Sequence, residues 1–260
     1  MEKFVELPLR REFGTRGEMA LYLASQFPHA EGDLSPILGG RSVADRKLAS
    51  FRASEYAGTR NFLNGTVSRL SPYLRHGVIR LASVRRSVSA SLTKFIQELA
   101  WRDYYQRVYF QIGNAVWSDR EEYKTGIPAS GYKAEVPADV VEGRTGLACI
   151  DAFTADLQAD GYLHNHARMW FAAYLVHWRR IRWQAGAKFF LQHLLDGDPS
   201  SNNLSWQWVA STFSNKPYIF NRENLERYTA GEFCADCPSR NKCPFDATYE
   251  ELSERLFKID

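Results

Sequence analysis

The chain has 260 residues, enough for one large domain or two small ones with a substantial apolar core. Its formal net charge of +3 is mild, which excludes a protein that binds nucleic acid through a strong overall basic field. No apolar run is long enough to span a membrane and the N-terminus is charged, so we expect a soluble, cytoplasmic monomer. The 7 Trp, 13 Tyr and 16 Phe suit stacking on flat ligands or bases, and they also suit a large helical core.

Two regions of different character divide the chain. Residues 1–38 contain several Pro and Gly breaks, and we expect an N-terminal arm that packs on the main body and carries a short helix near residues 17–26. Residues 39–260 are helical in pattern, beginning with an expected helix over 41–56, and form the main domain. Since no stretch alternates as a strand would, the sequence predicts an all-α fold.

A hydroxyl-rich loop over 65–70 precedes the next expected helix. Ser71 is placed to cap that helix and Pro72 to occupy its first position. Hydroxyls, Arg69 and free backbone amides at a helix start suit a phosphate group. Ser-Pro caps are common, so a plain cap is the simpler interpretation of this loop by itself.

The clearest helical pattern covers residues 93–112. Glu98, Trp101, Arg102 and Tyr105 follow the i, i+3, i+4, i+7 spacing and share one face. An acid, an indole, a guanidinium and a phenol on one face suit the wall of a pocket. A half-buried face with an internal Glu–Arg pair explains the pattern equally well.

The second half continues with a loop over 128–143 and a helix that Thr145 is expected to cap. An aromatic helix then extends to residue 183. Its His164 and His166 lack the i, i+4 spacing of a helical zinc pair, so we do not expect them to bind metal. The segment His177–Trp183 interleaves basic residues with indoles, which is typical of a solvated face and also occurs in nucleic-acid contacts.

The stretch Asp196–Trp208 holds two carboxylates, two adjacent amides and two tryptophans. It follows an apolar, helical run over 187–195, which places Asp196 near a helix end. Buried polar groups need partners, so a site for something polar and flat is one interpretation. A capped turn followed by an ordinary aromatic helix is the other.

Six motifs occur in one order along the chain: Gly39-Gly40 with Tyr56 and Arg60, the Ser68–Leu74 loop, Glu98–Arg102, Thr145-Gly146, His164-Asn165 with Arg168-Met169, and Asp196–Trp208. Together they resemble the flavin-site signature of the photolyase/cryptochrome family, in order and approximate spacing. The resemblance covers only the helical FAD-binding domain. The family's N-terminal α/β domain, which houses the antenna pigment, has no counterpart in residues 1–38, so we expect no antenna chromophore in this chain.

The resemblance implies an FAD held in a U shape. Tyr56 and the loop Ser68–Ser71 would hold the pyrophosphate, while Arg168 would pair with Asp196 beside the isoalloxazine. Asp198 would bind the ring edge or the ribose region. The amide of Asn202 would face the flavin N5. The implied cofactor-binding residues are Tyr56, Ser68, Arg69, Leu70, Ser71, Arg102, Asn165, Arg168, Asp196, Gly197, Asp198 and Asn202.

The resemblance also implies a cavity for a flipped pyrimidine dimer, a lesion that costs less to flip than a paired base. Trp101 and Trp206 would form its flat walls and Glu98 would hydrogen-bond the bases. Met169 favours the cyclobutane dimer, since relatives that repair the (6-4) product carry histidine there. The implied DNA-binding residues are Glu98, Trp101, Tyr105, Asn165, Met169 and Trp206. The family reaction is light-driven electron donation from reduced FAD to the dimer, ring splitting and return of the electron.

The family also has a tryptophan relay that photoreduces the flavin. Trp206 and Trp183 match its inner two members, and the outer member falls near Tyr123, with Trp117 or Trp178 as substitutes. The residues that the resemblance places in the chemistry are Glu98, Trp101, Met169, Asn202, Trp206, Trp183 and Tyr123.

The four cysteines resemble those of the iron–sulfur branch of bacterial photolyases, in which four cysteines hold a 4Fe–4S cluster. They are Cys149, Cys234, Cys237 and Cys243. Thiolates in this number also suit zinc, so the spacing leaves zinc and free thiols as alternatives. Cysteines in an intracellular protein favour metal binding or core packing over disulfides.

Three functions compete. The first is a light-dependent DNA repair enzyme of the photolyase type that acts on cyclobutane dimers in UV-damaged single- or double-stranded DNA. The second is a cryptochrome-like blue-light photoreceptor that uses the same flavin and repairs nothing. A helical nucleic-acid module without flavin would require six matched motifs to be coincidence, so we set it aside.

Overall fold

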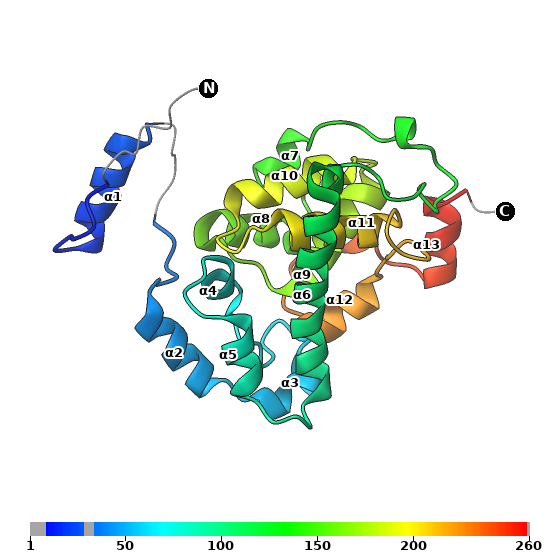
Figure 1. Ribbon diagram of the computed structural model, residues 1–260. Helices are drawn as coiled ribbons and strands as arrows, with labels where there is room; N and C mark the ends of the chain where they lie inside the picture. The colour runs from blue at the N-terminus through cyan, green and yellow to red at the C-terminus, as the bar shows by residue number, and fades with distance from the viewer. Residues whose placement is uncertain (1–8, 29–33, 259–260) are drawn as a thin grey trace. The chain divides into compact units, whose positions relative to one another are not determined.

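The computed structural model describes residues 9–28 and 34–258, and these are helical (Figure 1). Their only β feature is an isolated bridge between Lys133 and Ile181, so the predicted all-α fold is confirmed. The chain divides into two compact units, Met1–Pro36 and Ile37–Asp260. The expected packing of the N-terminal arm on the main body stays a prediction. No described helix has the length and apolar character that crossing a membrane requires.

Within its described residues, 9–28 and 34–36, the first unit has the helix α1 (Arg16–Gln26), at the position predicted. Thr15 caps it, since its hydroxyl accepts a hydrogen bond from the Glu18 backbone N–H at 3.1 Å.

The second unit contains the remaining helices. In chain order they are α2 (Arg41–Ser50), α3 (Ala53–Thr59), α4 (Ser71–Arg75), α5 (Leu81–Arg86), α6 (Thr93–Ile112), η1 (Gly113–Trp117), η2 (Ala129–Gly131), α7 (Ala138–Val141), α8 (Ala148–Asp160), α9 (Asn165–Ala173), η3 (Tyr174–Trp178), α10 (Trp183–His193), α11 (Pro199–Ala210), α12 (Arg222–Thr229), η4 (Arg240–Lys242) and α13 (Tyr249–Leu256).

The main core lies among α8 to α11, where the apolar faces of these helices meet. Its largest buried side chains include Trp170, Trp183, Phe171 and Phe190. A second cluster joins α2, α4 and α5 to Phe95 near the start of α6. The 20-residue α6 therefore contacts both sets of helices, since α3 and α5 pack on it and so does α11 (Figure 1).

Three local predictions were wrong, each because a tertiary contact overrides a local signal. The helix expected over 41–56 breaks at Phe51, whose ψ of 116° is extended and whose ring packs on Phe95 with centroids 4.8 Å apart. Ser71 lies inside α4 and makes no capping bond. Thr145 does not cap α8, which begins at Ala148 with Leu147 at the cap position; the Thr145 hydroxyl donates to Asp151 at 2.7 Å and accepts from the Leu147 N–H at 3.2 Å.

The segment His177–Trp183 was expected to be a solvated face of one continuous helix, and this prediction was wrong. His177 and Trp183 are fully buried. The chain leaves the helix at Arg180, whose φ of +54° is left-handed, and pairs with Lys133 before α10 begins. This change of direction therefore places Trp183 in the main core.

Candidate functional site

A buried ion pair forms the centre of the site. Arg168 on α9 donates from Nη2 to both carboxylate oxygens of Asp196, at 3.0 and 2.9 Å, and from Nε to the Leu163 carbonyl at 2.8 Å. Asp196 is 6% exposed and follows α10, as predicted. The Ser71 side chain lies close enough to Asp196 to favour its ionised form. Burial alone would raise the pKa of the Asp196 carboxyl, but Arg168 and these hydrogen bonds outweigh burial and lower it.

Asp198 has the structural role that the capped-turn interpretation of this stretch predicted. It caps α11, with Oδ1 accepting from the Ser200 backbone at 3.2 Å. Its Oδ2 accepts from the hydroxyls of Ser200 and Ser201 and from the amide of Gln106, with the Arg102 guanidinium 3.9 Å away. The carboxylate therefore ties α6 to the start of α11, and a direct contact with the flavin stays a prediction.

The amide of Asn202 has a fixed orientation. Its Nδ2 donates to the Ala187 carbonyl at 3.0 Å and to Asn203 Oδ1 at 3.1 Å. These two bonds use both N–H groups, so only the Oδ1 acceptor remains for a ligand. An acceptor is the group that the predicted contact with a protonated flavin N5 needs.

Residues 65–69, which include Arg69, line a cavity of about 290 Å³ together with Lys47 and Arg52. Three cations and the Ser68 hydroxyl in one cavity suit the predicted pyrophosphate. Arg69 has a φ of +48°, an uncommon conformation for a residue with a side chain, and its guanidinium lies 5.3 Å over the Tyr162 ring. Arg168 also lies over that ring, at 5.5 Å, so Tyr162 links the loop to the central ion pair.

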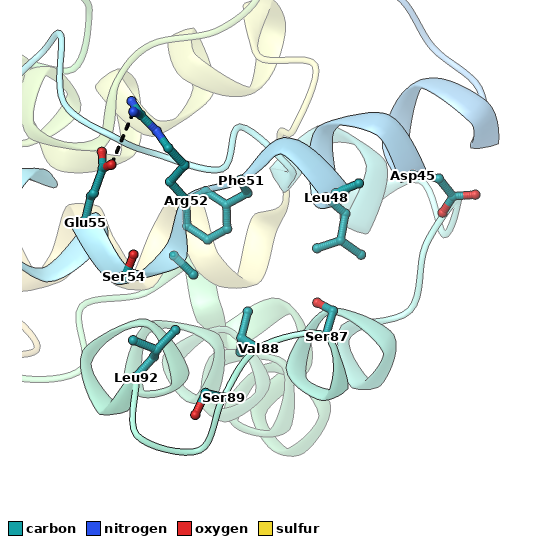
Figure 2. Close-up of a pocket in the computed structure, with 12 residues that line it drawn as sticks. Asp45, Leu48, Phe51, Arg52, Ser54, Glu55, Ser87, Val88, Ser89 and Leu92 are labelled. Atoms are coloured by element: carbon teal, nitrogen blue, oxygen red, sulfur yellow. Dashed lines mark ion pairs between the residues drawn. The ribbon is translucent and has the colours of Figure 1, made fainter.

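A second cleft, of about 600 Å³, lies beside this cavity and shares Phe51 and Arg52 with it. Figure 2 shows Leu48 and Phe51 facing Val88 across the gap, with Arg52 and Glu55 ion-paired at its edge. None of the predicted site residues lines it.

The face of α6 that carries Glu98, Trp101 and Tyr105 has no internal pair between Glu98 and Arg102, because Arg102 lies 3.9 Å from Asp198. Glu98 accepts from Arg60 and lies 3.0 Å from Lys94, so two cations hold its carboxylate. Trp101 is 46% exposed, and its ring contacts Tyr105 with centroids 5.7 Å apart. The face presents an aromatic surface beside a held carboxylate.

Two buried polar atoms lie unpaired near these groups. His164 is 7% exposed, and its Nε2 has no hydrogen-bond partner among the described residues. Burial, followed by His166 and the nearby arginines, lowers the pKa of His164 to about 4. Asn203 Nδ2 is likewise buried without a partner in the described part of the chain. A polar ligand in the site would satisfy such atoms.

Residues 95–232, more than half of the chain, match the family model of the FAD binding domain of DNA photolyase. The chain belongs to the DNA photolyase family.

Individual photolyases match a longer part of the chain. The deoxyribodipyrimidine photo-lyase of Streptomyces griseus is 34% identical over 190 residues, which cover 69% of this chain and 41% of that protein. The enzyme of the same name from Halobacterium salinarum is 32% identical over 243 residues, covering 83% and 50%. The crystal structure of the archaeal photolyase from Sulfolobus tokodaii, which contains two FAD molecules, superposes with a TM-score of 0.68 at 25% identity, covering 93% and 60%. The chain spans about half the length of the curated photolyases it matches.

Trp206, a predicted wall of the photolyase lesion cavity, is 2% exposed and packs edge-on against Phe190, with centroids 5.0 Å apart. Gly186 lets α10 approach it: a Cβ at residue 186 would lie 2.2 Å from the indole. Met169 is half-buried, and its sulfur lies 3.7 Å from the amide nitrogen of the exposed Asn165.

We expect Gly186→Ala to destabilise this photolyase-family domain by about 1–3 kcal/mol, because the rigid, buried indole of Trp206 has to move. Urea unfolding measures the effect. Gly58→Ala is the control, since its Cβ meets nothing within 4 Å and α3 gains a better helix former. Equal stability of the two variants would show that the contact of Gly186 with Trp206 is not tight.

Around Trp183, the predicted middle member of the photolyase relay, two aromatic residues compete for the outer position. The Trp117 ring stacks on Trp183 at 6.4 Å and 8°. Tyr123 lies near the Asp119 carboxylate, and its ring stacks on Tyr132 with centroids 4.4 Å apart. Trp178 packs instead on Phe245, toward the cysteines.

The structure brings the four cysteines around one cavity, which apolar side chains and two arginines complete: Leu147, Leu225, Phe233, Phe245, Arg222 and Arg240. Burial, and then the other cysteines, raises the pKa of the Cys149 thiol. No three His, Cys, Asp or Glu side chains in the described part of the chain are grouped closely enough to hold one metal ion. The thiols therefore surround a shared space without converging on a single point.

Gln106 and Asp119 are polar groups of the site that sequence reasoning missed. Gln106 bonds Asp198, and Asp119 accepts from the Trp183 indole at 2.6 Å. Neither belongs to a motif. For Gln106 the one available signal is its place next to Tyr105 on α6.

Proposed function

We propose that this chain is the flavin- and lesion-binding part of a light-dependent DNA repair enzyme of the deoxyribodipyrimidine photolyase type. The buried Arg168–Asp196 pair, within a match to the FAD-binding domain of DNA photolyase, carries the proposal. The names of the relatives and the two FAD molecules in the archaeal photolyase support it.

Residues of this chain suit both the pyrophosphate and the ring of an FAD molecule. The cavity with Lys47, Arg52 and Arg69 would take the pyrophosphate, and the Asn202 Oδ1 acceptor would face the ring. The unpaired His164 Nε2 would gain a partner, which supports the fit. When bound, FAD would supply light-driven one-electron transfer. The protein's part is to orient the ring and to exclude water around Asp196.

The lesion would lie against α6. Trp101 offers an exposed aromatic surface for a flipped base, and Glu98 offers carboxylate oxygens that its two cations hold in place. Asn165, Met169 and Trp206 would complete the cavity. The relay would run from Trp206 to Trp183 and on to Tyr123 or Trp117.

The test is blue-light treatment of the reduced, FAD-loaded protein with single- and double-stranded DNA that contains cyclobutane dimers. Loss of dimers in the light and not in the dark is the expected result. Flavin binding and photoreduction without dimer loss in either DNA would favour the photoreceptor instead.

We expect Glu98→Ala to lower dimer affinity roughly 10- to 100-fold, the effect of losing a hydrogen bond to a charged group. Flavin content should stay unchanged, because Asp196 and the phosphate cavity are intact. Fluorescence titration with a dimer-containing oligonucleotide measures the affinity, and flavin absorbance measures the content. Asp103→Ala, an exposed α6 carboxylate paired with Arg107, is the matched control. An unchanged affinity would remove Glu98 from the lesion site.

The four cysteines around one cavity would hold a 4Fe–4S cluster through their thiolates, as in the iron–sulfur photolyases that their spacing resembles. A zinc ion held by four thiolates is the alternative. The cluster would join α8 to the chain after α12.

A further inference from the structure

The indole of Trp183 has a charged hydrogen-bond partner that no part of the proposed function uses. Trp183 is fully buried, and its Nε1 donates to Asp119 Oδ1 at 2.6 Å. The Gln184 amide donates to the same oxygen at 3.0 Å, which fixes the carboxylate on the indole. A single neutral acceptor is enough to satisfy the N–H group of a buried indole. The carboxylate of Asp119 is therefore a stronger partner than burial of Trp183 alone requires.

The backbone around Asp119 is attached to the helix that carries Trp206. The Arg120 N–H donates to Gln207 Oε1 at 3.0 Å, and the Glu121 N–H donates to the Thr212 carbonyl at 3.0 Å. Gln207 is fully buried and follows Trp206 directly. The position of Asp119 is therefore fixed relative to Trp206, the proposed inner residue of the relay, as well as to Trp183.

The neighbouring aromatic groups have no hydrogen-bonded base in the described part of the chain. Lys188 lies 5.9 Å over the Trp117 ring, and its charge opposes a positive charge on that indole. Burial, and then the nearby Asp119 carboxylate, raises the pKa of the Tyr123 hydroxyl. Asp119 is therefore near both side chains, but its hydrogen bond is to the Trp183 indole.

From this geometry we propose, within the proposed photolyase-type function, that Asp119 is the proton acceptor of the relay. A photoexcited flavin is the one-electron oxidant. Trp206 loses one electron to it and regains one from Trp183. Removing an electron from an indole makes its N–H strongly acidic, so the Trp183 proton moves to Asp119. The products are a neutral indolyl radical and a carboxylic acid. When an electron returns to Trp183, the proton returns with it.

This proton transfer retains the separated charge for longer, because the electron cannot return from the reduced oxidant to Trp183 without the proton moving back from Asp119 too. It also implies that the radical of the oxidised relay is located on Trp183 rather than on Tyr123 or Trp117.

The test compares wild type with Asp119→Asn, which keeps an oxygen acceptor and removes the basic carboxylate, and with Asp119→Glu, which restores one. Glu121→Gln is the control, since it removes a nearby exposed charge that pairs with Lys124. The first readout needs no cofactor: the indole ¹H–¹⁵N NMR spectrum of the flavin-free chain. We expect Asp119→Asn to move the Trp183 resonance upfield and to leave the other six indole resonances nearly in place.

The second readout is transient absorption after one-electron oxidation, with FAD and also with an added photochemical ruthenium oxidant in the flavin-free chain. Wild type and Asp119→Glu should form the neutral indolyl radical, with a solvent deuterium isotope effect. Asp119→Asn should form the indole radical cation, which should decay roughly tenfold faster through loss of one charge-assisted hydrogen bond. An indolyl radical in Asp119→Asn, or an unmoved Trp183 resonance, would overturn the assignment. Failure to bind FAD would contradict the proposed function but not the role of Asp119, because the ruthenium experiment still measures the proton transfer.

Discussion

Asp196→Ala should empty the flavin site and destabilise the domain by about 3 kcal/mol. The variant leaves the partly buried Arg168 guanidinium without its carboxylate, and breaking one side of a buried pair costs about that much. It also removes the carboxylate that the Ser71 side chain approaches at the end of the phosphate loop. Flavin absorbance per chain and urea unfolding of the flavin-free protein measure the two losses separately.

Asp103→Ala serves again as the control, because Asp103 is half-exposed in its pair with Arg107 and should change stability by less than about 0.5 kcal/mol. If Asp196→Ala retains flavin and matches this control in urea, the ion pair does not organise the site.

The pH dependence of stability should follow the same pair. The folded-state pKa of Asp196 is lowered, so folding favours its ionised form, and the stabilisation is complete above the unfolded carboxyl pKa of about 3.9. It is lost as the pH falls through the folded pKa. Wild type should therefore lose stability more steeply than Asp196→Ala below about pH 4, as measured by urea unfolding at a series of pH values.

The centre of the site could be predicted from sequence because its residues belong to dense motifs. Arg168 and Asp196 lie 28 positions apart and still form the predicted ion pair. Asp119 and Trp183 are 64 positions apart, and Gln106 and Asp198 are 92 apart. A lone Asp and a lone Gln at such separations leave no periodic signal, so only the fold reveals that they bond these residues.

The wrong helix boundaries have a related cause. Nothing in the composition near Phe51 marks a helix break, since no Gly or Pro lies there. The extended backbone at Phe51 is selected by the packing of its ring on Phe95 and Tyr56, with centroids 4.8 and 6.1 Å away. Local propensity fails where a tertiary partner is stronger.

Cys237→Ala should remove the metal centre and loosen the C-terminal part of the domain. Purified wild type should contain about four iron atoms and four acid-labile sulfides per chain, with a broad visible absorption beneath the flavin bands. The variant should lose this iron. Because the cluster would connect Cys149 on α8 to the segment from Cys234 to Cys243, its loss should also lower the melting temperature and expose that segment to protease.

Ser239→Ala distinguishes attachment of the C-terminal segment by a metal centre from attachment by ordinary side-chain contacts. The Ser239 hydroxyl donates to the Gly146 carbonyl at 2.8 Å, so this variant removes a link between the same two regions and keeps every thiol. It should retain its iron and resist protease better than Cys237→Ala. One zinc per chain and no iron would show that the thiols converge on a single ion after all. Equal protease resistance in the two variants would show that side-chain contacts such as Ser239–Gly146, rather than a cluster, hold the C-terminal segment on α8.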